Sequence, residues 1–95
     1  MHNKIDISII IPVFNEENSL DKLYKEISTN ISQKYSWELI FINDGSKDDS
    51  KNIILKLLSK YSNIKLIDFY RNHGKSEALN AGFNMSKGKT IITLD

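Results

Sequence analysis

The 95-residue sequence contains no cysteine, which excludes disulfide bonds and thiolate-bound metals. No stretch approaches the roughly 18 consecutive apolar residues of a membrane-spanning helix, and no apolar segment of a secretory signal follows the first residues. Neither sign of charge dominates, because the net charge is +1 and basic and acidic residues are mixed. Nothing therefore favours nucleic acid as a partner, and we expect a cytoplasmic protein.

A single proline and four glycines leave no Pro/Gly-rich linker, and the chain has no internal repeat. This length allows one small domain with a core but not two. The last residues, 90–95, predict a buried strand that ends on the carboxylate of Asp95. Because domains seldom stop where a strand passes into its functional loop, we expect residues 1–95 to be one domain, truncated at that point.

Four short, isoleucine-rich runs predict β-strands at residues 7–11, 37–42, 64–69 and 91–94. Near-continuous apolar runs are typical of strands buried on both faces, as in a parallel sheet. Between them, apolar residues recur with helical spacing over 20–31, 53–61 and 75–86. Ser46 and Asp49 resemble a capping box for the second helix, and Gly88 suits the C-cap of the third. The alternation predicts an α/β domain, βαβαβαβ, with parallel strands.

Each predicted strand is followed by polar residues, at 12–17, 43–50, 71–75 and 95. Ligands of open parallel sheets bind beyond the carboxyl ends of the strands, so these groups predict a site at one edge. In the first group, turn chemistry explains much: Pro12 ends the strand, Asn15 caps the next helix, and Glu16 and Glu17 favour its first turn. The functional interpretation is that Glu16 accepts hydrogen bonds from ribose hydroxyls while Pro12 and Phe14 border a base.

Asp44 in the second group either bonds its own backbone in a turn or accepts a hydrogen bond from a base N–H. In the third group Arg71 is the only arginine beside twelve lysines, which hints at a need for a planar fork. Lys75 starts a helix, where a cation opposes the dipole unless an anion such as a diphosphate lies nearby. Asp95 alone would hold Mg²⁺ or Mn²⁺ poorly without a second ligand. His73 receives no role.

Taken together, residues 8–17, 42–50, 71–83 and 93–95 resemble family 2 glycosyltransferases in order and spacing. The segment 71–75 is most similar to enzymes that transfer a hexose to a polyprenyl phosphate, the dolichol-phosphate mannose synthase-like branch. The resemblance covers almost the whole chain. It implies the first half of a GT-A fold, a Rossmann-like α/β/α domain with strand order 3-2-1-4.

The resemblance also implies a function: inverting, metal-dependent transfer from a UDP- or GDP-sugar. Pro12, Phe14 and Glu16 would line the base and ribose pocket, and Asp44 would bind the base. Arg71 and Lys75 would lie near the nucleotide. Asp95 would be the first aspartate of the Asp-x-Asp motif that binds Mg²⁺ or Mn²⁺.

The acceptor would be a polyprenyl phosphate or a glycan, and the full-length protein would work at the cytoplasmic face of a membrane. The isolated chain, without the second aspartate and the acceptor half, is expected to be inactive. Its fourth strand would be an exposed edge that favours self-association.

Three alternatives remain. A nicotinamide dehydrogenase needs glycines after the first strand, and residues 12–17 contain none. A receiver-like, non-enzymatic module that binds Mg²⁺ or a nucleotide is a second alternative, although its acidic pair would come earlier than Glu16. A fragment that folds but binds nothing is the third.

Overall fold

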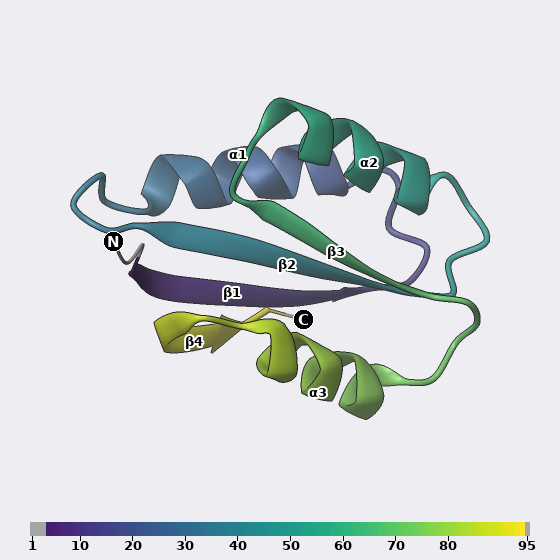
Figure 1. Cartoon of the computed structure of the whole chain (residues 1–95). Helices are drawn as coiled ribbons and strands as arrows, with labels where there is room; N and C mark the ends of the chain where they lie inside the picture. The colour runs from purple at the N-terminus through teal and green to yellow at the C-terminus, as the bar shows by residue number, and fades with distance from the viewer. Residues whose placement is uncertain (1–3, 95) are drawn as a thin grey trace.

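The computed structural model describes residues 4–94, which form a layered α/β fold (Figure 1). The strands are β1 (Ile5–Val13), β2 (Trp37–Asp44), β3 (Ile64–Phe69) and β4 (Gly88–Thr93). The helices between them are α1 (Leu20–Asn30), α2 (Ser50–Lys60) and α3 (Lys75–Met85). No helix among these residues is long and apolar enough to cross a membrane. The order βαβαβαβ agrees with the pattern predicted from the sequence.

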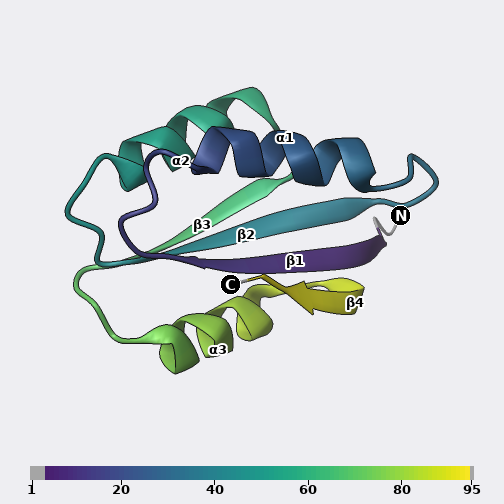
Figure 2. The ribbon, with the colours of Figure 1, turned by 180° about the vertical axis from the view of Figure 1, so that it is seen from behind.

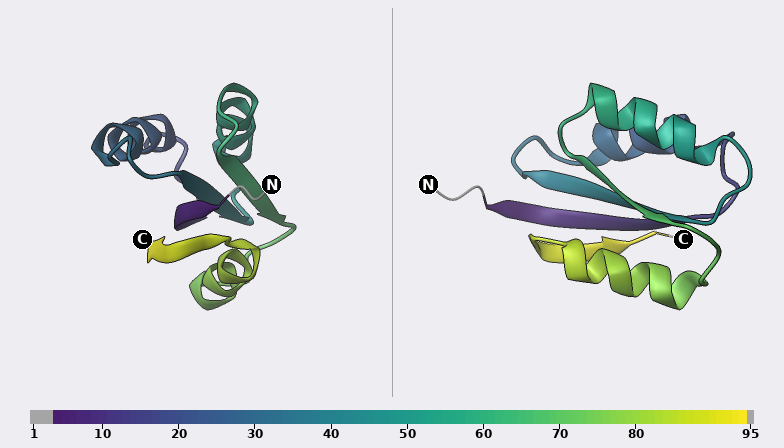
Figure 3. Two further views of the ribbon diagram at one scale, coloured as in Figure 1. Left: turned by 60° about the vertical axis from the view of Figure 1, so that its left-hand side comes forward. Right: turned by 45° about the vertical axis from the view of Figure 1, so that its right-hand side comes forward.

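All strand pairs are parallel, and the sheet order is β3-β2-β1-β4. Helices α1 and α2 cover one face of the sheet and α3 covers the other (Figure 3). This arrangement follows from right-handed crossovers, because the chain winds outward from β1 to β3 and then returns past β1 to form β4. The predicted Rossmann-like three-layer fold and its 3-2-1-4 order are thus confirmed.

The apolar core has two parts, one on each face of the sheet. Alternate residues of β1 and β2, including Ile9 and Phe41, pack against α1 and α2. Ile10, Ile40 and Ile42 face the other way and pack against Ala78 of α3. A Cβ on Gly82 would overlap the Ile10 side chain, so the absence of a side chain there lets α3 lie close to the sheet.

A row of polar side chains, centred on the buried Glu38, crosses the α3 face of the sheet on the amino-terminal side of these residues. Glu38, 2% exposed, accepts a hydrogen bond from Ser8 Oγ at 2.5 Å and from Lys87 N–H at 2.7 Å. Its Oε1 lies 2.7 Å from Lys65 Nζ in an ion pair. Ser8 Oγ in turn accepts the Gly88 N–H at 2.7 Å. The row therefore joins all four strands and fixes the start of β4.

The structure corrects the predicted role of Pro12. β1 does not end there but continues to Val13, and Pro12 is in register with Ile42. The main-chain groups of Ile10 point toward β4, since Ile10 O accepts the Leu94 N–H. Pro12, two residues later, points the same way, past the end of β4. Its missing N–H therefore costs no ladder hydrogen bond.

Two predictions of helix caps are also wrong. Gly88 is not the C-cap of α3, which is Ser86, but the first residue of β4. The N-cap of α2 is Asp49, without a side-chain capping bond, and Ser46 lies outside the helix.

At α1 the N-cap is Ser19 and the acidic residue of the first turn is Asp21. Asn15, Glu16 and Glu17 lie in the preceding loop instead. The Asn15 side chain accepts the Lys47 N–H, and the backbone N–H groups of Glu16 and Glu17 donate to Ser50 and Asp48, so other segments hold this loop.

Candidate functional site

The loops that follow β1, β2 and β3 gather at the carboxyl edge of the sheet, on the left in Figure 2. They comprise residues 14–19, 45–49 and 70–74. The sequence predicted this meeting point, because parallel strands end at the same edge. The fourth predicted group, Asp95, lies outside the described residues.

Asp44, the last residue of β2, connects the second loop to the third. One carboxylate oxygen accepts the His73 N–H at 2.7 Å, and the other accepts the Gly74 N–H at 3.0 Å and Asn72 Nδ2 at 3.1 Å. Asp44 is only 4% exposed. The sequence analysis considered a bond from Asp44 to its own backbone or to a base N–H. In the structure Asp44 instead binds the backbone of another loop.

Gly45 makes this approach possible. Its φ is +73°, and a Cβ at this position would overlap the backbone of Arg71 and Asn72. The third loop therefore crosses directly over Gly45, where only glycine leaves the space and adopts the left-handed conformation freely.

The first and second loops are joined by a series of hydrogen bonds. Three consecutive backbone N–H groups, of Asn15, Glu16 and Glu17, donate to side chains of residues 46–50. Their acceptors are Ser46 Oγ at 2.9 Å, Ser50 Oγ at 2.9 Å and Asp48 Oδ2 at 3.1 Å, respectively. In return Asn15 Oδ1 accepts the Lys47 N–H at 2.8 Å. The first loop is thus held by groups from the second.

Two carboxylates at this edge have lowered pKa values. Desolvation raises the pKa of Asp48, but hydrogen bonds from Ser50 and the Glu17 N–H outweigh it. Desolvation likewise raises the pKa of Asp68, and its contacts with Lys51 Nζ at 2.9 Å and Asn43 Nδ2 at 2.9 Å outweigh it. Both groups are therefore held in their charged forms.

Two cavities flank the end of β1. The carboxyl-edge cavity has a volume of about 300 Å³ and is lined by Pro12, Val13, Phe14, Glu16, Asp44, Asn72, Gly74 and Lys75. Its size is at the lower end of small-molecule sites. Five of the six predicted nucleotide-binding residues line it: Pro12, Phe14, Glu16, Asp44 and Lys75. They come from the end of β1 and the loop after it, the end of β2 and the start of α3, and the fold brings them together.

Arg71, the sixth predicted residue, is exposed and does not line this cavity. Its backbone passes over Gly45, so it lies beside the site. His73, which received no role, contributes its backbone N–H to Asp44, and its ring packs edge-on against Phe69 with centroids 4.9 Å apart. Its Nδ1 lies 3.2 Å from Glu77.

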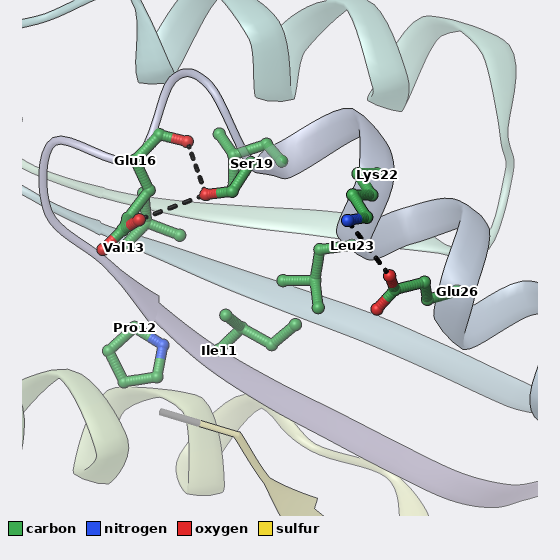
Figure 4. Close-up of a pocket in the computed structure, with 9 residues that line it drawn as sticks. Ile11, Pro12, Val13, Glu16, Ser19, Lys22, Leu23 and Glu26 are labelled. Atoms are coloured by element: carbon green, nitrogen blue, oxygen red, sulfur yellow. Dashed lines mark hydrogen bonds and ion pairs between the residues drawn. The ribbon is translucent and has the colours of Figure 1, made fainter.

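The α1-side cavity, about 310 Å³, lies on the other side of β1 (Figure 4). Ile11 and Leu23 form an apolar part between β1 and α1. Ser19 Oγ donates to Glu16 O or Oε2, and Lys22 pairs with Glu26 at 3.9 Å on the exposed rim. Of the residues predicted to bind a nucleotide, Pro12 and Glu16 lie here, and they line both cavities.

No group of three or more metal-ligating side chains is gathered within residues 4–94. The carboxyl-edge cavity combines an apolar wall with two carboxylates and one ammonium. It can accept hydrogen bonds from N–H and hydroxyl groups and can place a cation beside an anion.

Sequence reasoning missed the residues that hold the loops, namely Ser46, Asp48, Ser50 and Asn72. The available signal was the run of hydroxyl and carboxylate residues at 46–50, which was interpreted as helix capping. Their partners are 28 to 34 residues away along the chain, so spacing alone does not identify them.

Comparison with known proteins gives a consistent result. Residues 8–95 match the family model described as glycosyl transferase family 2. Over 98 aligned residues, the chain is 33% identical to a dolichyl-phosphate beta-glucosyltransferase of Trichomonas vaginalis, covering 97% of this chain and 30% of that protein. The chain spans between 27% and 30% of the length of such curated relatives.

Solved structures share the fold. Residues 1–349 of TarS from S. aureus, in complex with UDP-GlcNAc, superpose with a TM-score of 0.84 at 23% identity, over 96% of this chain and 26% of that one. The mannosyltransferase PcManGT from Pyrobaculum calidifontis, in complex with GDP-Man and Mn²⁺, gives 0.80 at 16% identity, over 94% and 26%. At these identities the likeness shows the fold alone, and it agrees with the predicted GT-A arrangement.

Proposed function

The chain belongs to glycosyl transferase family 2, and we propose that its carboxyl-edge cavity binds the nucleotide of a UDP- or GDP-sugar. The observation that carries this proposal is the convergence of Pro12, Phe14, Glu16, Asp44 and Lys75 on one cavity. These residues lie in three separate parts of the chain, at the ends of β1 and β2 and at the start of α3.

Each wall of the cavity suits one part of a nucleotide. Phe14, 46% exposed, presents a ring that can cover a base beside the Pro12 ring. Among the described residues, Asp44 Oδ1 accepts the His73 N–H alone, so this oxygen keeps a lone pair for a base N–H. Glu16 is exposed at the cavity, where it can accept hydrogen bonds from ribose hydroxyls.

The phosphates of the nucleotide would bind on the α3 side of the cavity. Lys75 is the first residue of α3, directly after Gly74, and both line the cavity. Helix N-termini favour anions through their N–H groups and dipole. Arg71 lies on the same loop, outside the cavity lining, and is placed to reach the outer phosphate or the sugar.

Calorimetric titration with UDP and GDP, with and without Mn²⁺ and with NADH as control, tests this proposal. We expect saturable binding of one nucleoside diphosphate, no binding of NADH, and loss of binding in Phe14→Ala. Phe83→Ala is the matched control, because Phe83 is similarly exposed at 44% but lies on α3 away from the cavity lining. Equal affinity in both variants would contradict the proposal.

A divalent metal is part of the proposed reaction, since the related fold of PcManGT was solved with GDP-Man and Mn²⁺. Asp95 would supply the first carboxylate and a residue beyond it the second. Bound there, Mg²⁺ or Mn²⁺ would act as a Lewis acid that neutralises the leaving diphosphate.

The acceptor would be a polyprenyl phosphate or a polysaccharide precursor, as in the dolichyl-phosphate relative, and the sugar would be transferred with inversion. We place the full-length protein in the cytoplasm, at the cytoplasmic face of a membrane.

Residues 1–95 would be its truncated nucleotide-sugar-binding domain. The isolated chain would lack transferase activity, and detectable sugar transfer by the purified chain would contradict this.

Self-association of the isolated chain is a further part of the proposal. β4 is paired with β1 only, its residues from Lys89 to Thr93 are exposed, and Ile91 and Ile92 are each 40% exposed. Exposed apolar edge strands favour pairing with another chain. Light scattering should detect dimers or larger species at high concentration, and Ile92→Lys should reduce them. A clean monomer at high concentration would count against this part.

The match of residues 8–95 to glycosyl transferase family 2 disfavours a receiver-like, non-enzymatic module.

A further inference from the structure

We propose that Asp48 and Ser50 are positioning residues of the nucleotide site, which hold the β1–α1 loop, and with it Glu16 and Phe14, in place before any ligand binds. This inference rests on the proposed function for the ligand. Neither residue lines the carboxyl-edge cavity, so both would act only through the loop.

The first observation is that consecutive N–H groups of the β1–α1 loop donate to side chains of another segment. Consecutive N–H groups of a loop would ordinarily be satisfied by water or by turns within the loop. Here those of Glu16 and Glu17 donate to Ser50 Oγ at 2.9 Å and to Asp48 Oδ2 at 3.1 Å. Asp48 lies in the loop after β2, and Ser50 is the first residue of α2.

The second observation is that the two acceptors are themselves fixed. Ser50 is fully buried, at 0% exposure, and is the first residue of α2. Its own N–H donates to Asp48 Oδ1 at 2.9 Å. A carboxylate held by two N–H groups from different segments, and a buried hydroxyl at a helix start, are rigid reference points.

The third observation is the backbone of the captured loop. Asn15 has a φ of +54°, the sole positive φ of a non-glycine residue among those the structure describes. Such conformations persist where surrounding contacts determine them. Asn15 has these contacts: its N–H donates to Ser46 Oγ, and its Oδ1 accepts the Lys47 N–H. The loop conformation is thus imposed by the neighbouring loop.

The consequence for binding is preorganisation. Phe14 and Glu16, the two walls of the cavity that the β1–α1 loop carries, flank Asn15. A ligand meets these walls already in position and does not have to order them, which strengthens binding. Release of the loop would weaken binding without removing any group that touches the nucleotide.

Asp48→Asn tests the inference most selectively. The amide oxygen can still accept the Ser50 N–H, whereas the new NH₂ group faces the Glu17 N–H. Asp49→Asn is the matched control, since Asp49 is adjacent and exposed and, within residues 4–94, its carboxylate bonds to Asn52 Nδ2 alone. Ser50→Ala is the second variant, and Ser59→Ala, which removes an exposed hydroxyl of the same helix, is its control.

Amide hydrogen exchange of the ligand-free chain, measured by NMR, gives the first result. We expect exchange about tenfold faster at Glu17 in Asp48→Asn and at Glu16 in Ser50→Ala, with the core amides of Ile10 and Ile40 unchanged. General destabilisation would accelerate the core amides as well and would overturn the inference. Unchanged exchange at Glu16 and Glu17 would also overturn it.

Nucleotide affinity gives the second result. The Kd for the nucleoside diphosphate that the chain binds, UDP or GDP, should rise about tenfold in Asp48→Asn and in Ser50→Ala, as the loss of one hydrogen bond predicts. Both controls should bind normally, and Ser50→Thr, which restores a hydroxyl, should recover affinity relative to Ser50→Ala. An unchanged Kd in Asp48→Asn overturns this inference alone, whereas no binding by the unchanged chain overturns the proposed function with it.

Discussion

The carboxylate of Asp44, at the end of β2, accepts the backbone N–H of His73, in the loop after β3, at 2.7 Å. The two residues are 29 positions apart in the sequence. With the Gly74 N–H at 3.0 Å, this bond fixes the loop immediately before α3. The side chain proposed to contact the base therefore also shapes the phosphate side of the same cavity.

Asp44→Ala should accordingly remove both the proposed contact to the base and the hydrogen bonds that fix the loop before α3. Two loop N–H groups would lose their acceptor, so the free energy of unfolding should fall by about 1–3 kcal/mol, and nucleoside diphosphate binding should be lost. Urea denaturation and calorimetric titration measure these effects. Asp49→Ala, at an exposed carboxylate that accepts a hydrogen bond from Asn52, should leave binding intact, and equal losses in the two variants would contradict the assignment.

Glu38→Gln should destabilise the chain by about 2 kcal/mol, because it removes the charge that Lys65 pairs with in a buried site. Lys65 is partly exposed, which allows its ammonium to recover some hydration. Glu26→Gln makes the same chemical change in the exposed Lys22–Glu26 pair and should cost less than about 0.5 kcal/mol. Similar urea midpoints for the two variants would show that the buried row contributes little.

Stability should depend on acid through the same residue. Desolvation raises the pKa of Glu38, but the contacts with Lys65, Ser8 and the Lys87 N–H outweigh it, so the folded-state pKa is lowered. The unfolded chain then takes up a proton first as the pH falls below about 4.3. The contribution of Glu38 is complete above that pH and is lost as the pH falls through the folded-state pKa.

Unfolding curves between neutral pH and pH 3 should therefore show a shallower loss of stability in Glu38→Gln than in the unchanged chain. Asp48 and Asp68, whose pKa values are also lowered, should give the acid dependence that the variant retains. Parallel curves for the two proteins would contradict this role of Glu38.

Gly82→Ala should destabilise the chain by about 1–3 kcal/mol, although alanine is favoured over glycine in helices by about 1 kcal/mol. The new Cβ would overlap the side chain of Ile10, which is fully buried. Asn80→Ala, at an exposed position of the same helix, should be neutral or slightly stabilising. A rise in the thermal midpoint of Gly82→Ala would show that α3 can move away from the sheet without cost.

Much of the fold was predictable because its strands are short, apolar and separated by amphipathic segments. β3 was predicted with its observed limits, and β2 with its observed start. β4 was placed three residues too late, because Gly88, Lys89 and Thr90 carry no apolar pattern. Their place in the sheet depends on the buried row, in which Ser8 and Glu38 bind the N–H groups of Gly88 and Lys87.

The convergence of the candidate residues on one cavity was predictable for a related reason, whereas their role remains a proposal. The ends of parallel strands meet, so Phe14, Asp44 and Lys75 could be grouped without knowledge of any contact. The hydrogen bonds between the loops could not be inferred, because Asp48 and Ser50 have the same composition as a helix cap. Their acceptor roles depend on how far the β1–α1 loop extends, which is a property of the three-dimensional packing.

Chemical-shift mapping of the ¹⁵N-labelled chain during titration with UDP and GDP tests the central claim most directly. The account predicts that the largest saturable changes fall on Phe14, Glu16, Gly74 and Lys75, with the α1-side cavity residues Leu23 and Glu26 unaffected. Changes centred on Leu23 and Glu26, or none in a folded sample at millimolar nucleotide, would contradict the claim that the carboxyl-edge cavity binds the nucleotide.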